Sequence, residues 1–291
     1  MILNTNRQAL LATNALWHRN NALGKASTNL SIGTKVNKTG DDPTGMAVSN
    51  KMKLQIKGLE MADRNVNDAV SLIQTAEGSI SEMQDIVQRM RELAVQGSNG
   101  TLTPEDKELI QKEIEQLAQE LDGMAERSEF NKRHLLNDDY EELTFHVGSN
   151  HTDNFTISLK ALNSAVLGIS IIDSPEYDKN GNIVAGGAIV PGLDYTRDGG
   201  AEEAIERCDE ALERINIYRG NLGASINRLE KISSSLVISE ENTRAALSRV
   251  VDTDMAGEMA EYTKNNVLVQ AGISMLSQAN QRPNQLLSLL Q

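Results

Sequence analysis

The feature that most constrains this chain is a row of nine apolar residues that repeats in alternating steps of three and four between positions 66 and 94. Such steps bring side chains onto one face of an α-helix, and a row repeated every seven residues packs against another helix. The row therefore predicts a long helix in a coiled-coil bundle. Its members are Val66, Ala69, Ile73, Ala76, Ile80, Met83, Val87, Met90 and Ala94.

A second helix is predicted to follow a turn at residues 97–103. The segment 97–100 (GSNG) ends the first helix, and Thr103 then acts as the cap of the next. Pro104 suits the first helical position, and Asp106 stands where a capping box needs an acceptor. The heptad row continues in the new helix through Ile110, Ile114, Leu117, Leu121 and Met124.

A third, longer helix is predicted for residues 201–250, which contain no proline. Fifty helical residues extend about 75 Å, a rod longer than a compact domain needs. Only one Trp, three Phe and five Tyr occur in the 291 residues, a composition that also favours thin bundles over a thick core. The apolar positions of the row include Ile205, Cys208, Leu212, Ile215, Leu222, Ile226, Leu229 and Leu236.

Both ends of the chain carry weaker helical patterns. Two rows of residues seven apart precede Gly33: Leu3, Leu10 and Trp17, and Leu16, Leu23 and Leu30. Near the other end, a row interrupted by Asn266 contains Met255, Met259, Tyr262, Val269, Ile273 and Leu276. Helices of this kind are marginal alone in water. We expect these ends to become ordered on assembly with a partner surface.

The middle of the chain has a different pattern. Residues 143–147 and 155–159 alternate apolar and polar side chains, as half-buried strands do. Residues 168–172 form a candidate third strand, and residues 177–182 read as a turn. The predicted fold is mainly α, a long antiparallel coiled-coil bundle formed by both chain ends, with a small strand-and-loop region between them.

Several classes of function are disfavoured by composition. The net charge of −13 argues against nucleic-acid binding, and no apolar run is long enough for a membrane span. The sequence contains one cysteine and no His-Glu-x-x-His motif, so we expect no disulfide, metal or cofactor. The first residues lack a secretory signal pattern, which taken alone predicts a cytoplasmic protein.

Several blocks at the two ends closely resemble the bacterial flagellins. Near the N-terminus these are residues 30–37 (LSIGTKVN), 41–47 (DDPTGMA), 74–78 (QTAEG), 88–96 (QRMRELAVQ), 130–131 (FN) and 135–136 (LL). Near the C-terminus they are residues 227–229 (NRL), 248–256 (SRVVDTDMA), 262–266 (YTKNN) and 275–281 (MLSQANQ). Two positions depart from the family pattern: Pro43 replaces a common alanine, and residues 132–134 (KRH) stand where a Gly-containing turn is common.

The resemblance implies a structural subunit that polymerises with copies of itself into the hollow flagellar filament used for swimming, and not an enzyme. It also implies export of the unfolded chain and folding at the filament tip, which replaces the cytoplasmic expectation with a secreted, extracellular one. Residues 1–40 with 255–291 would form the inner tube, 41–137 with 201–254 the helical core, and 138–200 the solvent-facing segment. An export chaperone, the cap and the hook-junction proteins are further implied partners, with no nucleic acid and no membrane among them.

Three sets of site residues follow from the heptad rows and the resemblance. Inner-tube packing is assigned to Leu3, Leu10, Trp17, Leu23, Leu30, Met259, Tyr262, Val269, Ile273 and Leu276. The core seam is assigned to Val66, Ile73, Ile80, Met83, Val87, Met90, Ile114, Leu117, Leu121, Leu212, Ile215, Leu222, Ile226 and Leu229. A subunit-contact face, which in many flagellins is also sensed by a Toll-like receptor of the animal host, is assigned to Arg89, Leu93, Gln96 and Glu113.

Two alternatives share part of this evidence. A hook–filament junction protein has related ends but would not form long filaments. A secreted adhesin or enzyme with flagellin-like ends would need a binding or catalytic set in residues 138–200, where the sequence has no clustered catalytic residues.

Overall fold

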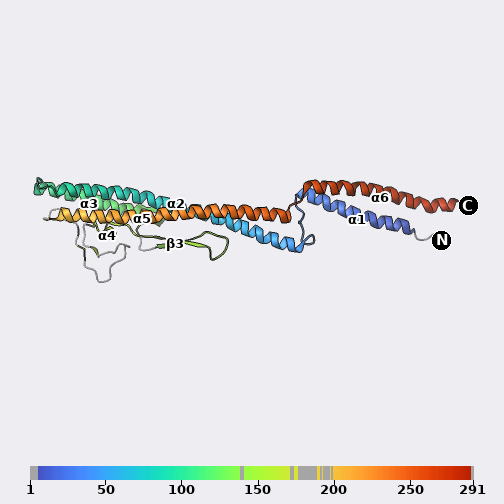
Figure 1. The fold of residues 1–291 in the computed structure, drawn as a ribbon, viewed down its shortest axis with the longest axis horizontal. Helices are drawn as coiled ribbons and strands as arrows, with labels where there is room; N and C mark the ends of the chain where they lie inside the picture. The colour runs from blue at the N-terminus through green and yellow to red at the C-terminus, as the bar shows by residue number, and fades with distance from the viewer. Residues whose placement is uncertain are drawn as a thin grey trace. The chain divides into compact units, whose positions relative to one another are not determined.

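The computed structural model describes residues 6–137, 141–170, 174–175, 189–190, 192, 197 and 199–289 (Figure 1). The chain divides into two compact units, residues 1–57 with 240–291 and residues 58–239. The long helices α2 (Pro43–Gly97) and α5 (Gly200–Val251) contribute residues to both units. Among the described residues, no helix combines the length and the hydropathy that crossing a membrane requires.

The terminal unit is built around α1 (Arg7–Ile32) and α6 (Met255–Leu289), which lie side by side (Figure 1). Gly33 ends α1 in the left-handed conformation, with φ of 78°, and its N–H donates to the carbonyl of Asn29. The predicted helix before Gly33 is therefore confirmed. The two connectors that follow α1 and precede α6 are paired, because the N–H of Lys35 donates to the carbonyl of Val251 (2.7 Å) and that of Thr253 to Gly33 (3.0 Å).

The helix cap that the sequence predicts at Thr103 is present, and Asp42 forms a second cap. Asp42 Oδ1 accepts from the N–H groups of Thr44 (3.1 Å) and Gly45 (2.9 Å), directly before Pro43 begins α2. In front of α3 (Pro104–Arg127), the Thr103 hydroxyl accepts from the N–H of Asp106 while the Asp106 carboxylate accepts from the N–H of Thr103. This reciprocal capping box satisfies backbone donors that a helix start leaves unpaired.

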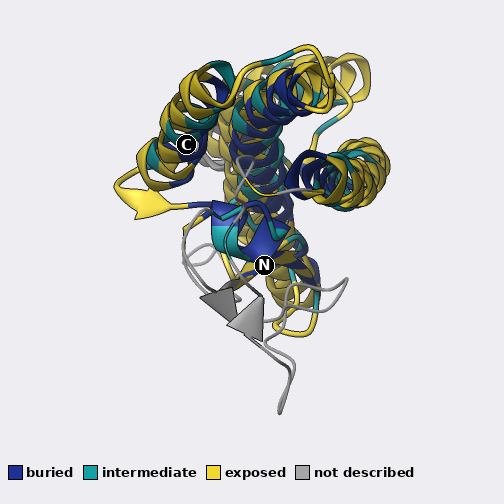
Figure 2. Ribbon diagram, turned by 90° about the vertical axis from the view of Figure 1, so that its left-hand side faces the viewer, coloured by how far each residue is buried: buried dark blue, intermediate teal, exposed yellow. Residues whose placement is uncertain are grey.

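The second unit is a bundle of α2, α3 and α5 around one apolar core (Figure 1). All nine residues of the predicted row between 66 and 94 are 0% exposed, so the heptad phase of α2 is confirmed. Figure 2 shows buried residues along inner faces and exposed residues along outer ones. On α5 the predicted positions Cys208, Ile215 and Leu222 are buried. Between them the buried residues are Ala204 and Ala211, each one position before the predicted Ile205 and Leu212.

In the sequence, the small strands lie between α3 and α5. β1 (Glu129–Phe130) pairs with β2 (Arg133–His134), β3 (Glu141–His146) with β4 (Asn154–Leu159), and β5 (Ser174–Pro175) with β6 (Ile189–Val190), each pair antiparallel. The β1–β2 turn places Asn131 and Lys132 at φ of 52° and 66°, as a type I′ hairpin turn requires. β3 and β4 confirm the two predicted strands, and β4 buries alternate side chains.

The predicted strand at 168–172 is wrong in its described part. The short helix α4 (Ser164–Leu167) ends at Gly168, whose φ of 78° is left-handed, and residues 169–170 belong to no strand. An isolated glycine can begin a strand pattern or end a helix, and here it ends a four-residue helix whose start is capped by Asn163. Residues 171–172 and the predicted turn at 177–182 lie outside the described residues.

Candidate functional site

The terminal pair packs through a mixture of small, polar and half-buried apolar side chains. The row of α6 that is half-buried or buried against α1 alternates in steps of three and four: Glu258, Tyr262, Asn265, Val269, Gly272, Leu276 and Ala279. On α1 the corresponding residues are Ala9, Ala12, Leu16, Ala22, Leu23, Ala26, Asn29 and Leu30. A Cβ atom added to Gly272 would lie 2.9 Å from Leu16 Cδ1, so Gly272 leaves room for the end of the Leu16 side chain.

The larger apolar side chains of the pair point away from this contact. Leu10 and Trp17 are each 63% exposed, Met259 is 51% exposed and Ile273 is 54% exposed. These four inner-tube residues therefore do not pack between α1 and α6 of the same chain. Leu23, Leu30, Tyr262, Val269 and Leu276 are half-buried in the pair, and Leu3 lies outside the described residues.

Further large apolar side chains of the pair are exposed. Leu11, Met255, Val267 and Met275 are also between 49% and 67% exposed. Large exposed apolar surface on a pair of helices marks a region that binds another protein. The terminal pair thus leaves much of its large apolar surface outside the contact between α1 and α6.

The core seam residues lie together in the second unit. Val66, Ile73, Ile80, Met83, Val87, Met90, Ile114, Leu121, Ile215, Leu222 and Leu229 are buried in one cluster, and Leu117, Leu212 and Ile226 pack against it half-buried. Cys208 belongs to the same cluster, and its burial raises the pKa of the thiol to about 12. A thiol with so high a pKa is unreactive at neutral pH.

The hairpin face formed by α2 and α3 carries an exposed ion-pair group. Arg89 donates to Glu113 Oε1 (3.0 Å) and to Glu92 Oε2 (3.2 Å), and these hydrogen bonds, Glu113 first, raise the pKa of the guanidinium. Gln96 is exposed as well, but Leu93 is only 2% exposed and belongs to the core. The four predicted residues therefore do not form one exposed row, because the helical phase that buries Met90 and Ala94 also buries Leu93.

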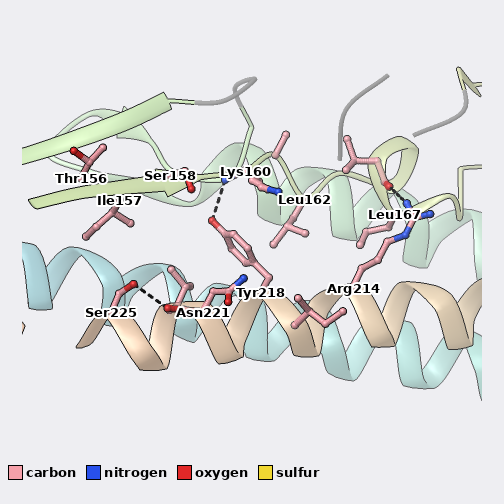
Figure 3. A pocket seen from close by; sticks show the side chains of 14 residues that line it. Thr156, Ile157, Ser158, Lys160, Leu162, Leu167, Arg214, Tyr218, Asn221 and Ser225 are labelled. Carbon is pink, nitrogen blue, oxygen red and sulfur yellow. Dashed lines mark hydrogen bonds between the residues drawn. The ribbon is translucent and has the colours of Figure 1, made fainter. Parts of the chain in front are cut away.

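A small cavity of about 220 Å³ lies between β4, the α4 segment and α5 (Figure 3). Its polar groups hold the strand segment on the helix: the Tyr218 hydroxyl accepts from the N–H of Lys160 (2.9 Å), and Arg214 donates to the carbonyl of Val166 (2.7 Å). Ligand pockets usually exceed roughly 300 Å³. The geometry supports a structural role for these residues, which the sequence patterns did not single out.

Further contacts join α2 to α5 in ways that sequence spacing does not reveal. Arg91 pairs with Asp209 (2.5 Å), and the Ser233 hydroxyl donates to Asp63 Oδ1 (2.6 Å). Among the described residues, no group of histidine, cysteine or acidic side chains has the arrangement of a metal site. The His146 ring lies 2.7 Å from Asn154 Oδ1, across the β3–β4 pair.

These features define a class of protein: a long-helix chain with a self-sufficient core and an open apolar face at its ends, as in a subunit of a larger assembly. The family comparisons agree with that class. Residues 3–141 match the model of the bacterial flagellin N-terminal helical region, and residues 205–290 match that of the C-terminal helical region. The chain belongs to the bacterial flagellin family.

Individual relatives match along their whole length. The chain is 41% identical to a flagellin of Bacillus subtilis and 38% identical to the flagellar filament 31.3 kDa core protein of Treponema maltophilum, in each case over 100% of both chains. A solved structure from Vibrio parahaemolyticus, described as a flagellar hook-associated protein, has a TM-score of 0.57 and covers 73% of this chain and 100% of its own. At 10% identity, that likeness shows the fold alone.

Proposed function

We propose that this chain is the structural subunit of a bacterial flagellar filament and that it assembles with copies of itself into a hollow helical tube. The observation that carries the proposal is the open apolar face of α1 and α6, where Leu10, Trp17 and Ile273 are more than half exposed. Their burial against neighbouring copies would supply the free energy of assembly. Contacts between two different faces of each copy, repeated without closing a ring, generate a filament.

In this proposal the chain divides by role. Residues 1–40 with 255–291 form the inner tube, residues 41–137 with 201–254 the core, and residues 138–200 the outward segment. The compact units divide instead at 57/58 and 239/240. The first turns of α2 and the last turns of α5 therefore group with the terminal helices in the folded chain, although their proposed role is in the core.

The test is seeded polymerisation followed by electron microscopy. The double variant Leu10→Ser/Trp17→Ser is expected to leave the fold of the monomer unchanged and to abolish long filaments. Ile238→Ser is the control, because Ile238 is similarly exposed at 60% but lies on α5, outside the terminal helices and the α2–α3 hairpin face. Normal filaments from the double variant would contradict the proposal. Open-ended growth by the unmodified chain also separates a filament subunit from a hook–filament junction protein.

The proposed role needs no chemical turnover, so the chain would act as an extracellular structural protein of the flagellum and not as an enzyme. An export chaperone, the filament cap and the hook-junction proteins would be its partners during export and growth. Binding of a sugar or a cell surface by full-length monomer, lost on deletion of residues 176–188, would instead support the adhesin alternative.

The hairpin face is a second proposed contact, for subunits and for a Toll-like receptor of the host. Arg89, Gln96 and Glu113 are accessible there, while Leu93 would support them from the core. The exchange Arg89→Glu/Glu113→Arg keeps an internal ion pair but reverses the charges presented. If a partner binds through these charges, the exchanged variant should no longer trigger receptor signalling as a monomer and should form weaker filaments. If the pair serves only the fold, the exchange should behave like the parent.

A further inference from the structure

The two compact units of this chain carry net charges of opposite sign. Residues 1–57 with 240–291 hold 12 Lys and Arg against 8 Asp and Glu, a net charge of +4. Residues 58–239 hold 16 against 33, a net charge of −17. Complementary charges favour one arrangement of two partners, and like charges oppose the others. Two copies of the chain are therefore attracted when the terminal unit of one approaches the second unit of the other.

An outward face of α2 in the terminal unit combines cations with an exposed leucine. Lys51, Leu54 and Lys57 follow one another in steps of three, on the side of the helix away from the buried Ser49 and Ile56. Leu54 is 72% exposed. Within the described part of the chain, neither lysine side chain has an ion-pair or hydrogen-bond partner, so both charges are available to another molecule. We call Lys51, Leu54 and Lys57 the basic face.

A face of opposite charge lies on the first turns of α5 in the second unit. Glu202, Glu206 and Ile217 share the side of the helix opposite its buried side, and Ile217 is 49% exposed. Asp209, on the same side, already pairs with Arg91 of α2 (2.5 Å). The carboxylates of Glu202 and Glu206 are exposed and have no such partner among the described residues. We call Glu202, Glu206 and Ile217 the acidic face.

We propose that the basic face of one copy binds the acidic face of the next copy in the filament. The proposal rests on the proposed function, because it assigns two of the surfaces through which filament subunits meet. Each face combines one exposed aliphatic side chain with two unpaired charges, so contact buries Leu54 and Ile217 while it brings lysines to glutamates.

The difference between the two faces also sets the kind of assembly. A bound copy still presents its other face, so the contact repeats in one direction, as a filament requires. Two basic faces repel each other, and so do two acidic faces. This repulsion disfavours the symmetric dimers that would stop growth.

Reversal of the charges on each face, alone and together, tests the contact in the full-length chain. Lys51→Glu/Lys57→Glu and Glu202→Lys/Glu206→Lys each place like charges in the proposed contact. Either double variant should raise the critical concentration, the protein left in solution beside sedimented filaments, about tenfold, equivalent to about 1.4 kcal/mol. The variant with all four substitutions places opposite charges in the contact again, so its critical concentration should return close to the parent value.

Lys132→Glu/Lys231→Glu is the matched control, because both lysines are exposed outside the two faces and the change in net charge is the same as in the basic-face variant. The control should keep the parent critical concentration. At about 1 M salt both double variants should approach the parent, because the screening length falls to about 3 Å. Helix content by circular dichroism accompanies each variant.

Three results would overturn the proposed contact while the parent still forms filaments: double variants that polymerise like the parent, no recovery in the variant with four substitutions, or the same loss in the control. A parent that forms no filaments would instead contradict the proposed function, and the contact with it. The behaviour of the parent therefore separates failure of the contact from failure of the proposed function.

Discussion

The two helical regions of this flagellin use the heptad repeat in opposite ways. In the bundle of α2, α3 and α5, the large apolar side chains face inward and are fully buried. In the α1–α6 pair, small and polar residues share the contact with apolar residues that are only half-buried, and large apolar residues such as Trp17 remain outside. The comparison teaches that a heptad row identifies an interface without saying whether its partner belongs to the same chain.

The difference has an energetic meaning. Burial of a large aliphatic side chain contributes roughly 1.5–3 kcal/mol, so the bundle can be stable as a monomer. The terminal pair gains little from alanine and glycine, and it buries Asn265 with an unpaired oxygen. We expect its stability to come mainly from neighbouring copies.

The largest expected effect contrasts one isoleucine in each region. Ile80 is 0% exposed in the bundle, so Ile80→Ala should lower the free energy of unfolding by about 2–5 kcal/mol. Ile273 is 54% exposed, and Ile273→Ala should change monomer stability by less than about 0.5 kcal/mol. Urea unfolding of the monomer, followed by circular dichroism, measures both. Equal losses would show that the terminal pair is no weaker than the bundle.

Alkaline pH should destabilise the bundle. Burial raises the pKa of Cys208 from 9.0 to about 12 and that of Tyr218 from 10.0 to about 12. The folded chain therefore holds these protons more tightly than the unfolded chain. The resulting stability is complete below pH 9 and is lost as pH rises towards 12, with a total of up to about 7 kcal/mol for the two groups at about 1.4 kcal/mol per pKa unit.

Urea unfolding at a series of pH values from 8 to 11 checks this dependence. The double variant Cys208→Ala/Tyr218→Phe should flatten it, although it also removes the bond from the N–H of Lys160 to the Tyr218 hydroxyl and so lowers stability at every pH. An equally steep loss in that variant would assign the alkaline effect to other groups.

Helix caps provide a matched test of intermediate size. Thr103→Ala removes half of the capping box of α3 and should cost the bundle about 1 kcal/mol in urea unfolding. Asn6→Ala removes the cap of α1 and its bond to Ala279, and should leave bundle unfolding unchanged. The loss should appear instead as faster amide hydrogen exchange in the first turns of α1. A shift of the main unfolding transition by Asn6→Ala would show that the two units unfold together.

The smallest expected effect concerns the surface ion pair of Arg91 and Asp209. Their side chains are 43% and 52% exposed, so a double-mutant cycle with Arg91→Ala and Asp209→Ala should yield less than about 1 kcal/mol. The coupling should decrease further at 1 M salt, where charges are screened. A larger, salt-independent coupling would mean that polar contacts add substantially to the seam of the bundle.

Much of this architecture was predictable before the structure. The burial of the nine-residue row of α2 follows from its heptad spacing alone. The caps at Asp42 and Thr103 depend on residues two or three positions away along the chain. Local chemistry of this kind is readable because its partners are a few positions away. The helical end at Gly168 was misread because a strand start and a left-handed cap share the same residue.

The sequence by itself determined that the chain is long-helical, where its main helices begin and end, and which face of α2 is buried. The tertiary structure decided which of two overlapping rows of α6 faces α1. Both rows contain Tyr262, Val269 and Leu276, and one adds Met259 and Ile273 where the other adds Asn265 and Gly272. Hydrophobicity favours the first row. In the folded chain the second row faces α1, where Gly272 leaves room for the Leu16 side chain, and Met259 and Ile273 of the first row remain exposed, where copies of the chain can bury them.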